Sequence, residues 1–289
     1  MDANKMARLT QGMKQIKASN KSNLNISRQD AEALNYQGIE AVNNGNFSGA
    51  LNLFQQAAEA GNIDAMGNLA YLFENGEGVR QNFAEAFKWY KKAALGGNTD
   101  AMWSVATAYK EGIGTNQDDA QHFAWIKKLA ESGDVQAMAV LGDAYFGGEG
   151  VMQNNDEAFK WYSRAANNGH INAMLSVAFF YAHGNVVEQN PILAMGWIER
   201  AANEANAQQE FDAISDIATT MRNLGDVFYD QNTYWENWAR REGIILTDLG
   251  SDNPAKDLYK HYLVCYEKAA RMGDSKATET LHRINSSFF

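Results

Sequence analysis

The chain has 289 residues, of which 45% are hydrophobic and 21% are charged, and its formal net charge is −10. This acidic balance, without a Lys/Arg stripe in the sequence, counts against nucleic acid as the main partner, because phosphate binding needs a clustered basic face. No stretch of eighteen apolar residues occurs, so the sequence predicts no membrane span.

Cysteine usage and the start of the chain favour a cytoplasmic location. Cys265 is the single cysteine, so an intramolecular disulfide is impossible, which fits a reducing compartment. The first thirty residues lack the apolar core of a secretory signal. We therefore expect a cytoplasmic protein.

Residues 1–29 are basic and polar, and four apolar side chains among them fall roughly on one helical face. Three interpretations remain open. The segment is a short helix that caps a stack of repeats, a mobile basic tail, or a weak anchor at a membrane surface.

Residues 30–207 form the repeat region. It opens over 31–63 with a predicted helical pair, joined by a turn at 44–46. Four units then follow, over 64–99, 100–135, 136–171 and 172–207. The positions that recur at a spacing of 36 include Ala65, Ala101, Ala137 and Ala173; Met66, Met102, Met138 and Met174; Gly76, Gly112, Gly148 and Gly184; and Trp89, Trp125, Trp161 and Trp197. A fixed period of this length predicts an all-α solenoid of stacked helix–turn–helix repeats.

Each unit has the same predicted anatomy. A first helix, helix A, ends at a glycine such as Gly76, because a backbone with positive φ after a helix end is easiest for glycine. A loop follows, and Asn82, Asp118 or Asn154 stands where a short side chain caps the second helix, helix B. Helix B carries the tryptophan and two small residues that let neighbouring helices approach closely.

Residues 208–289 break the period. An extra helical stretch is expected near 208–218, and residues 224–226 repeat the Leu-Gly-Asp of 141–143. Residues 231–254 form an insertion rich in aromatic residues, residues 266–270 restore a helix B, and 275–289 are expected to form a capping helix. Terminal repeats of solenoids are often irregular because one side faces water.

The repeated pattern resembles the Sel-one-like (Sel1-like) repeat, a longer-looped relative of the tetratricopeptide repeat. The best-matching unit is 136–171, through Leu141, Gly142, Tyr145, Gly148, Gly150, Val151, Ala158, Trp161, Tyr162, Ala165, Ala166 and Gly169. The resemblance implies a right-handed α–α superhelix. It also implies an adaptor that binds another protein or a peptide, often in bacteria, and some bacterial members look like immunity proteins or secretion-system accessory factors.

The same resemblance implies that the A helices line a concave face. Counting along each helix A predicts nine partner-binding residues: Tyr71, Trp103, Thr107, Lys110, Asp143, Phe146, Phe179, Arg222 and Asp226. Large apolar groups at such positions are typical contact anchors. The alternative is that Trp103, Phe146 and Phe179 pack against the neighbouring unit.

The sequence carries no motif for catalysis, and we expect neither an enzyme nor a cofactor. The histidines do not have zinc-ligand spacing, and no nucleophile elbow or Walker loop occurs. His261 and Cys265 are one helical turn apart, but Cys265 occupies the position of a core tryptophan. Three hypotheses follow: an interaction module, an immunity or secretion-associated protein, and an enzyme that uses the insertion at 231–254.

Overall fold

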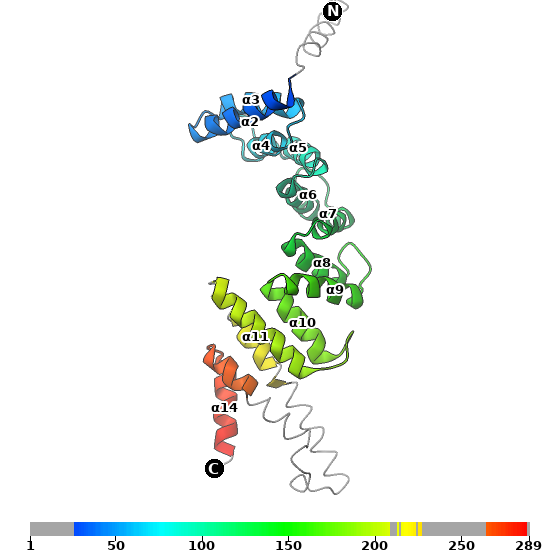
Figure 1. Cartoon of the computed structure of the whole chain (residues 1–289), viewed down its shortest axis with the longest axis vertical. Coiled ribbons are helices and arrows are strands. Elements are labelled where there is room, and N and C mark those ends of the chain that lie inside the picture. Colours follow the sequence, from blue (N-terminus) through cyan, green and yellow to red (C-terminus); the bar gives the residue numbers. More distant parts are fainter. Residues whose placement is uncertain (1–25, 209–212, 214, 224, 227–263, 288–289) are drawn as a thin grey trace, which may run out of the picture. The chain divides into compact units, whose positions relative to one another are not determined.

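The computed structural model describes residues 26–208, 213, 215–223, 225–226 and 264–287. All regular secondary structure in these residues is helical, as the sequence predicts for an all-α solenoid. Helices follow one another as antiparallel hairpins (Figure 1). The chain divides into two compact units, Met1–Trp125 and Ile126–Phe289, and the boundary falls within helix α7.

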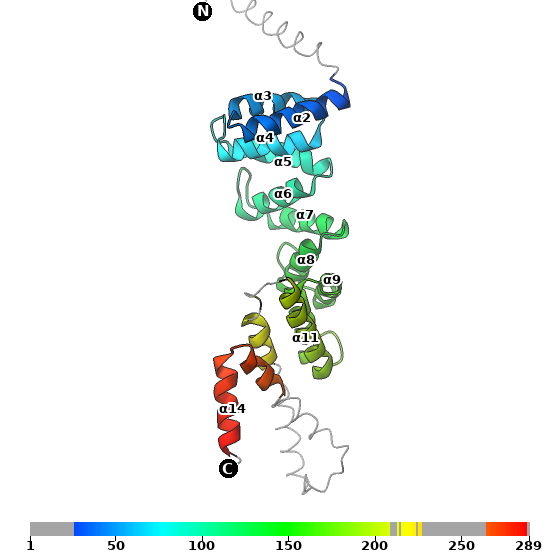
Figure 2. The same ribbon diagram turned by 60° about the vertical axis from the view of Figure 1, so that its left-hand side comes forward.

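The first unit consists of helices α2 to α6 and the first part of α7. Each helix packs on the next from α2 to α6, and Figure 2 shows the first four of them side by side. The helices are α2 (Arg28–Asn43), α3 (Phe47–Glu59), α4 (Ile63–Asn75), α5 (Phe83–Leu95), α6 (Thr99–Glu111) and the first part of α7 (Asp119–Glu131).

The second unit repeats this packing from α8 to α11. Its helices are α8 (Val135–Gly147), α9 (Asn155–Asn167), α10 (Ile171–His183) and α11 (Pro191–Gln208), followed by helical residues 215–223 and 264–271 and by α14 (Ser275–Ser287). A buried cluster joins α10 and α11 to the later helices through Met174, Ile198, Met221 and Cys265.

The ends of the A helices, α4, α6, α8 and α10, are built alike. Gly76, Gly112, Gly148 and Gly184 each follow the last helical residue with φ between 70° and 75°, a left-handed backbone that side chains other than glycine rarely adopt. Asn62, Asn98, Asp134 and His170 cap the N-termini by accepting a bond from the backbone N–H three residues on.

The caps predicted for the B helices are confirmed. The side chains of Asn82, Asp118 and Asn154 accept bonds of 3.0–3.1 Å from the backbone N–H groups of Glu85, Gln121 and Glu157. These bonds satisfy donors that have no partner within their own helix.

The B-helix tryptophans are buried or half-buried, and three of them have a cation over one face of the ring. Trp161 is 7% exposed, and the Arg164 guanidinium carbon lies 4.5 Å from its ring centroid. The same arrangement places Lys92 over Trp89 at 3.6 Å and Arg200 over Trp197 at 5.1 Å. The sequence analysis found the tryptophans but not these covering cations, which also recur every 36 residues.

Two expectations about the less regular parts of the chain need revision, and others concern residues that the structure does not describe. Helix α2 begins at Arg28, inside the predicted tail, because Ser27 and Asp30 form a capping box at its start. Helix α11 runs on to Gln208, so the extra helical residues near 208–218 partly extend an existing helix. Residues 1–25, the insertion at 231–254 and His261 lie outside the described residues.

Candidate functional site

Six of the nine predicted residues line three grooves, two in the first unit and one in the second. Counting along the repeat therefore reaches grooves in both units, although it does not bring all nine predicted residues together. Tyr71 lines the largest groove, Trp103 and Thr107 line a smaller one, and Phe146, Phe179 and Asp226 line the groove of the second unit.

The groove of the second unit is mainly aromatic and aliphatic. It has a volume of about 710 Å³, and its lining includes Leu175, Ala178, Ala182 and Ile198 beside the aromatic rings. Phe146 and Phe179 are each 38% exposed. Their rings meet edge to face at a centroid distance of 6.0 Å, and each also contacts the buried Phe180. The contacts with Phe180 thus fix the orientation of both rings, and the rest of each ring is exposed to solvent.

His183 adds a polar edge to this aromatic groove. Its ring lies against that of Phe179 at a centroid distance of 4.2 Å, and its Nδ1 is 2.9 Å from the Phe179 carbonyl oxygen. On the remaining rim stand Thr220, Asn223 and Asp226. The groove therefore combines an apolar floor with polar groups at one margin, which is typical of protein-binding sites.

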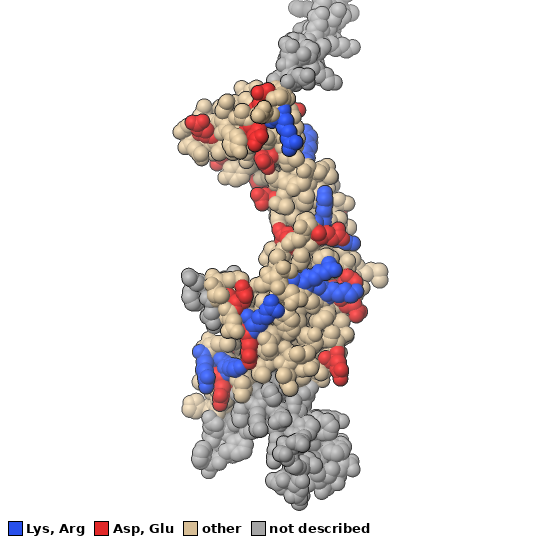
Figure 3. Space-filling model, in the orientation of Figure 1, with Lys and Arg blue, Asp and Glu red and all other residues tan. Residues whose placement is uncertain are grey.

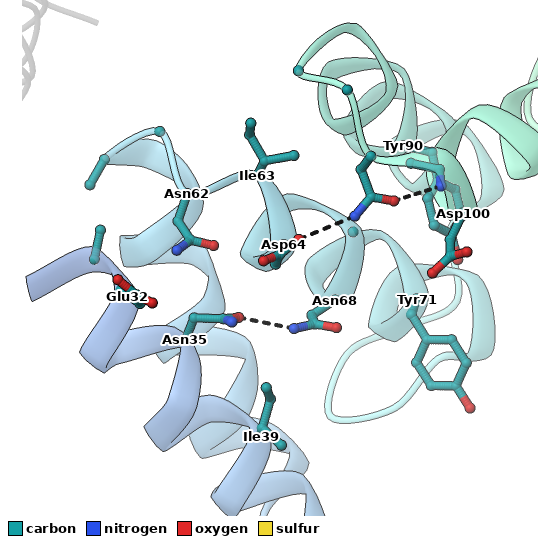
Figure 4. A pocket seen from close by; sticks show the side chains of 18 of the residues that line it. Glu32, Asn35, Ile39, Asn62, Ile63, Asp64, Asn68, Tyr71, Tyr90 and Asp100 are labelled. Carbon is teal, nitrogen blue, oxygen red and sulfur yellow. Dashed lines mark hydrogen bonds between the residues drawn. The ribbon is translucent and has the colours of Figure 1, made fainter. Parts of the chain in front are cut away.

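The largest groove, in the first unit, is polar. Its volume is about 1180 Å³, and it lies along α2, α4 and the start of α6. Figure 4 shows Asn35 of α2 and Asn68 of α4 facing each other across it, joined by a hydrogen bond of 2.9 Å. Sequence reasoning missed these two residues.

The smaller groove of the first unit has a volume of about 260 Å³. Trp103 and Thr107 of α6 share its lining with Phe83, Phe87 and Ile113. The Trp103 side chain is half-buried, so only part of its surface is available for the partner contact that the sequence predicts.

Lys110, Asp143 and Arg222 do not line these three grooves. Lys110 is half-buried on α6. The Arg222 guanidinium lies 3.2 Å from the Asp274 carboxylate and is mostly covered, and Asp143 accepts a 2.7 Å bond from the Tyr162 hydroxyl. The ion pair of Arg222 and the hydrogen bond of Asp143 therefore compete with the binding of a partner protein that was predicted for these two residues.

Tyrosines of the B helices hold carboxylates of the A helices in both units. Tyr162 donates to Asp143 and Tyr266 to Asp226, whereas Tyr90 donates to Glu74 at 2.7 Å. Burial, together with the facing carboxylate, raises the pKa of both Tyr90 and Tyr162, so the hydroxyls remain protonated donors. Burial likewise raises the pKa of Asp143, although the Tyr162 bond opposes that rise.

The chemistry of Cys265 does not favour a nucleophile. The residue is fully buried, its sulfur lies 3.9 Å from that of Met195, and burial raises the pKa of its thiol to about 12. Among the described residues, no group of three or more His, Cys, Asp or Glu side chains is placed to hold a metal ion. No helix of the described residues is long and apolar enough to span a bilayer.

Acidic and basic side chains are interspersed on the face drawn in Figure 3, where blue and red atoms lie beside one another over the described residues. Lys88 forms a salt bridge with Glu85, and Lys160 forms one with Glu157. Within each unit, the described residues on this face form no basic stripe of the kind that follows a phosphate backbone.

Comparison with protein families decides the identity of the repeat. The family model described as Sel1 repeat matches residues 33–62, 63–98, 99–134, 135–170, 171–206 and 263–274. The chain belongs to the Sel1 repeat family. Proteins built from Sel1 repeats are typically non-catalytic scaffolds that mediate protein interactions.

Solved structures show the same fold. A Sel1 repeat protein from Oxalobacter formigenes matches with 24% identity and a TM-score of 0.58, over 85% of this chain and 88% of that one. The uropathogenic Escherichia coli protein c5321, described as a protective antigen with an SLR (Sel1-like repeat) fold, matches with 25% identity and a TM-score of 0.57, over 94% and 67%.

An immunity protein of Pseudomonas aeruginosa, Pa5087, also matches, with 16% identity and a TM-score of 0.34 over 87% of this chain and 85% of that one. That score is too low to support an argument about function. The comparison with curated proteins gives no match.

Proposed function

We propose that this Sel1 repeat protein is a non-enzymatic adaptor that binds another protein or a peptide through the exposed surfaces of its A helices. The aromatic groove of the second unit is the main anchor point. Cys265 is the single cysteine of the chain, which supports the reducing cytoplasm as the place where the adaptor works.

The pair formed by Phe146 and Phe179 is the observation that carries this proposal. Two phenylalanine rings that remain 38% exposed retain apolar surface in contact with water, and a partner that covers them gains the free energy of removing it. Their contacts with Phe180 hold both rings in one orientation, so binding loses little side-chain entropy. Rigid aromatic side chains in a groove are characteristic of binding hot spots.

The test is affinity capture from the native cell extract, with full-length wild type beside the Phe179→Ala variant. Leu95→Ala is the matched control, because Leu95 is 65% exposed on a helix of the same fold and lines none of the three grooves. Circular dichroism first establishes that all three proteins are folded.

We expect wild type and Leu95→Ala to retain one stoichiometric protein that Phe179→Ala loses. Loss of a single hot-spot ring weakens binding by about 2 kcal/mol or more, a factor of roughly thirty. If Phe179→Ala retained the same protein in the same amount, the aromatic groove would not be the binding site. A Trp103→Ala variant then examines the smaller groove of the first unit.

A further inference from the structure

The polar groove of the first unit contains an unusual buried side chain. Asn35 is 6% exposed and is the one buried polar residue in the described part of the chain. Its Oδ1 accepts the bond from Asn68, but no described residue accepts from its amide nitrogen. The amide nitrogen is not among the fully buried atoms that lack a partner, so it is accessible from the groove and can donate to a ligand that supplies an acceptor.

The Asn35–Asn68 pair leaves one whole amide group and one carbonyl oxygen without a partner. Because the bond between the side chains joins the Asn35 oxygen to the Asn68 nitrogen, the Asn35 amide N–H2 and the Asn68 carbonyl oxygen remain. A peptide unit offers the complementary C=O and N–H groups. In the close-up both side chains face the space between α2 and α4, where an extended backbone would reach them (Figure 4).

Three carboxylates give this groove a negative potential. Glu32, Asp64 and Asp100 are exposed, and Arg28 is the single basic residue that lines the groove with them. Among the described residues no ion pair involves these three carboxylates; Asp64 accepts a 3.3 Å bond from the Asn98 side chain. The groove therefore has unneutralised charge for a cation to pair with.

Tyrosine rings supply the third element of the groove. Tyr36 is 64% exposed and Tyr71 is 50% exposed, and both line it. A Lys or Arg side chain packs its aliphatic part against such rings and places its charge over the ring face or near a carboxylate. Phosphate-bearing ligands are disfavoured by the same carboxylates.

We infer that this groove binds an extended segment of a partner protein that carries a lysine or arginine, with the Asn35–Asn68 pair bonded to its backbone. Asp64 and Asp100 bind the basic side chain, and Tyr36 and Tyr71 flank it. The inference rests on the proposed function as a protein-binding module, and it adds a second site with a different chemistry from the aromatic groove.

The test selects random twelve-residue peptides from a display library on the immobilised full-length chain. The strongest peptide is then synthesised, and its dissociation constant is measured by fluorescence anisotropy. The groove variant is Asp64→Asn/Asp100→Asn. Its control, Asp119→Asn/Asp156→Asn, makes the same charge change in the first turns of two other helices, away from the groove.

We expect the selected peptides to be enriched in Lys or Arg. Binding weakens about tenfold in the groove variant, as estimated from two exposed charge pairs, and by less than about twofold in the control. Replacing the basic residue of the peptide by Gln produces a similar loss in wild type and almost none in the groove variant. Methylation of one backbone amide weakens binding to wild type but not to Asn68→Ala.

Two results would overturn the inference while leaving the proposed function intact. One is enrichment of apolar peptides whose binding is lost in Phe179→Ala and kept in Asp64→Asn/Asp100→Asn. The other is that wild type selects no peptide, whereas the Lys14→Ser/Lys17→Ser variant does. In that case the basic N-terminal segment of the chain itself would occupy the groove. If no peptide were selected by any variant and Phe179→Ala also retained every captured protein, both proposals would fail.

Discussion

The polar groove of the first unit and the aromatic groove of the second are built on the same repeat but present different chemistry. In the first turn of helix A the first unit has Asp64 and Asp100, where the second has Gln136 and Asn172. Two turns on, Tyr71 and Glu74 stand at the positions that Phe179 and Phe146 occupy in the second unit. The first surface suits a basic peptide, and the second suits an apolar anchor.

This difference shows where the repeat is constrained. The alanines that recur every 36 residues are buried between helices, as are Trp125 and Trp161, and a change of volume there disturbs neighbours on both sides. The groove positions have water on one side, so their side chains vary without loss of packing. One scaffold thus carries two surfaces with separate preferences.

The largest expected effect tests whether the two units share one kind of core. Trp161→Ala is predicted to lower the free energy of unfolding by about 3–5 kcal/mol, because it empties a site that is 7% exposed. Trp89→Ala should cost less, since Trp89 is only half-buried, although Lys92 covers its ring. Denaturant unfolding monitored by circular dichroism measures both. Equal losses would mean that packing around the two tryptophans does not differ.

A second comparison concerns Tyr90, Tyr162 and Tyr266, the B-helix tyrosines that donate to a carboxylate of helix A. Where helix A has Gly142 or Gly225, the tyrosine ring lies on the glycine and its hydroxyl reaches the next residue, Asp143 or Asp226. In the first unit Ala70 stands at the position of Gly142, and Tyr90 reaches Glu74 instead.

Gly142→Ala tests this interpretation. A Cβ atom there would lie 2.6 Å from the Tyr162 ring, so the ring must move and the protein should lose about 1–3 kcal/mol of stability. Gly196→Ala is the matched control, because its Cβ would meet nothing within 4 Å, and removing a helical glycine should stabilise by about 0.5–1 kcal/mol. A stable Gly142→Ala protein that kept the Tyr162–Asp143 bond would contradict the steric explanation.

The regular part of the fold could be predicted from the sequence because each unit repeats its own local signals. Gly76 ends helix A and Asn82 caps helix B, and both positions recur every 36 residues. The helix boundaries are therefore indicated independently in each of the four units. Phe146 and Phe179 could be placed in a groove for the same reason, since the period fixes which face of helix A they occupy.

What the sequence did not reveal depends on contacts where the period changes. Asn35 and Asn68 are 33 residues apart, because the first hairpin has a shorter loop, and their bond therefore escapes a search at 36. Arg222 was predicted to contact a partner protein. In the structure it forms an ion pair with Asp274, which lies 52 residues away in the chain. No local pattern indicates that pairing.

A smaller effect compares the helix caps of the two units. Asn82→Ala and Asn154→Ala should each cost about 1 kcal/mol, because each cap bonds the backbone N–H of a glutamate at 3.1 Å. Asn155→Ala should not destabilise the protein and should stabilise it by up to about 1 kcal/mol, because the buried Asn155 Oδ1 has no hydrogen bond to lose and its desolvation cost is removed. Thermal and denaturant unfolding measure all three. A clear difference between the two caps would show that the units differ in helix B as well as in their grooves.

The smallest effect concerns the pH dependence that Asp143 gives the second unit. Packing around its carboxylate raises its pKa in the folded protein above the ordinary value, and the Tyr162 hydroxyl only partly offsets this. A carboxyl whose pKa is higher in the folded state stabilises the fold when protonated. That contribution is complete below the unfolded-state pKa, about 3.9, and is lost as the pH rises through the folded-state value.

Asp143→Asn removes this titration while keeping a hydrogen-bond acceptor for Tyr162. The unfolding free energy of wild type minus that of Asp143→Asn should therefore fall as the pH rises from about 3 toward neutrality, and it should then become constant. Urea unfolding at a series of pH values gives the difference directly. A difference that rose with pH would mean that the bond from Tyr162 outweighs the burial of the carboxylate, and that Tyr162 stabilises the charged form of Asp143.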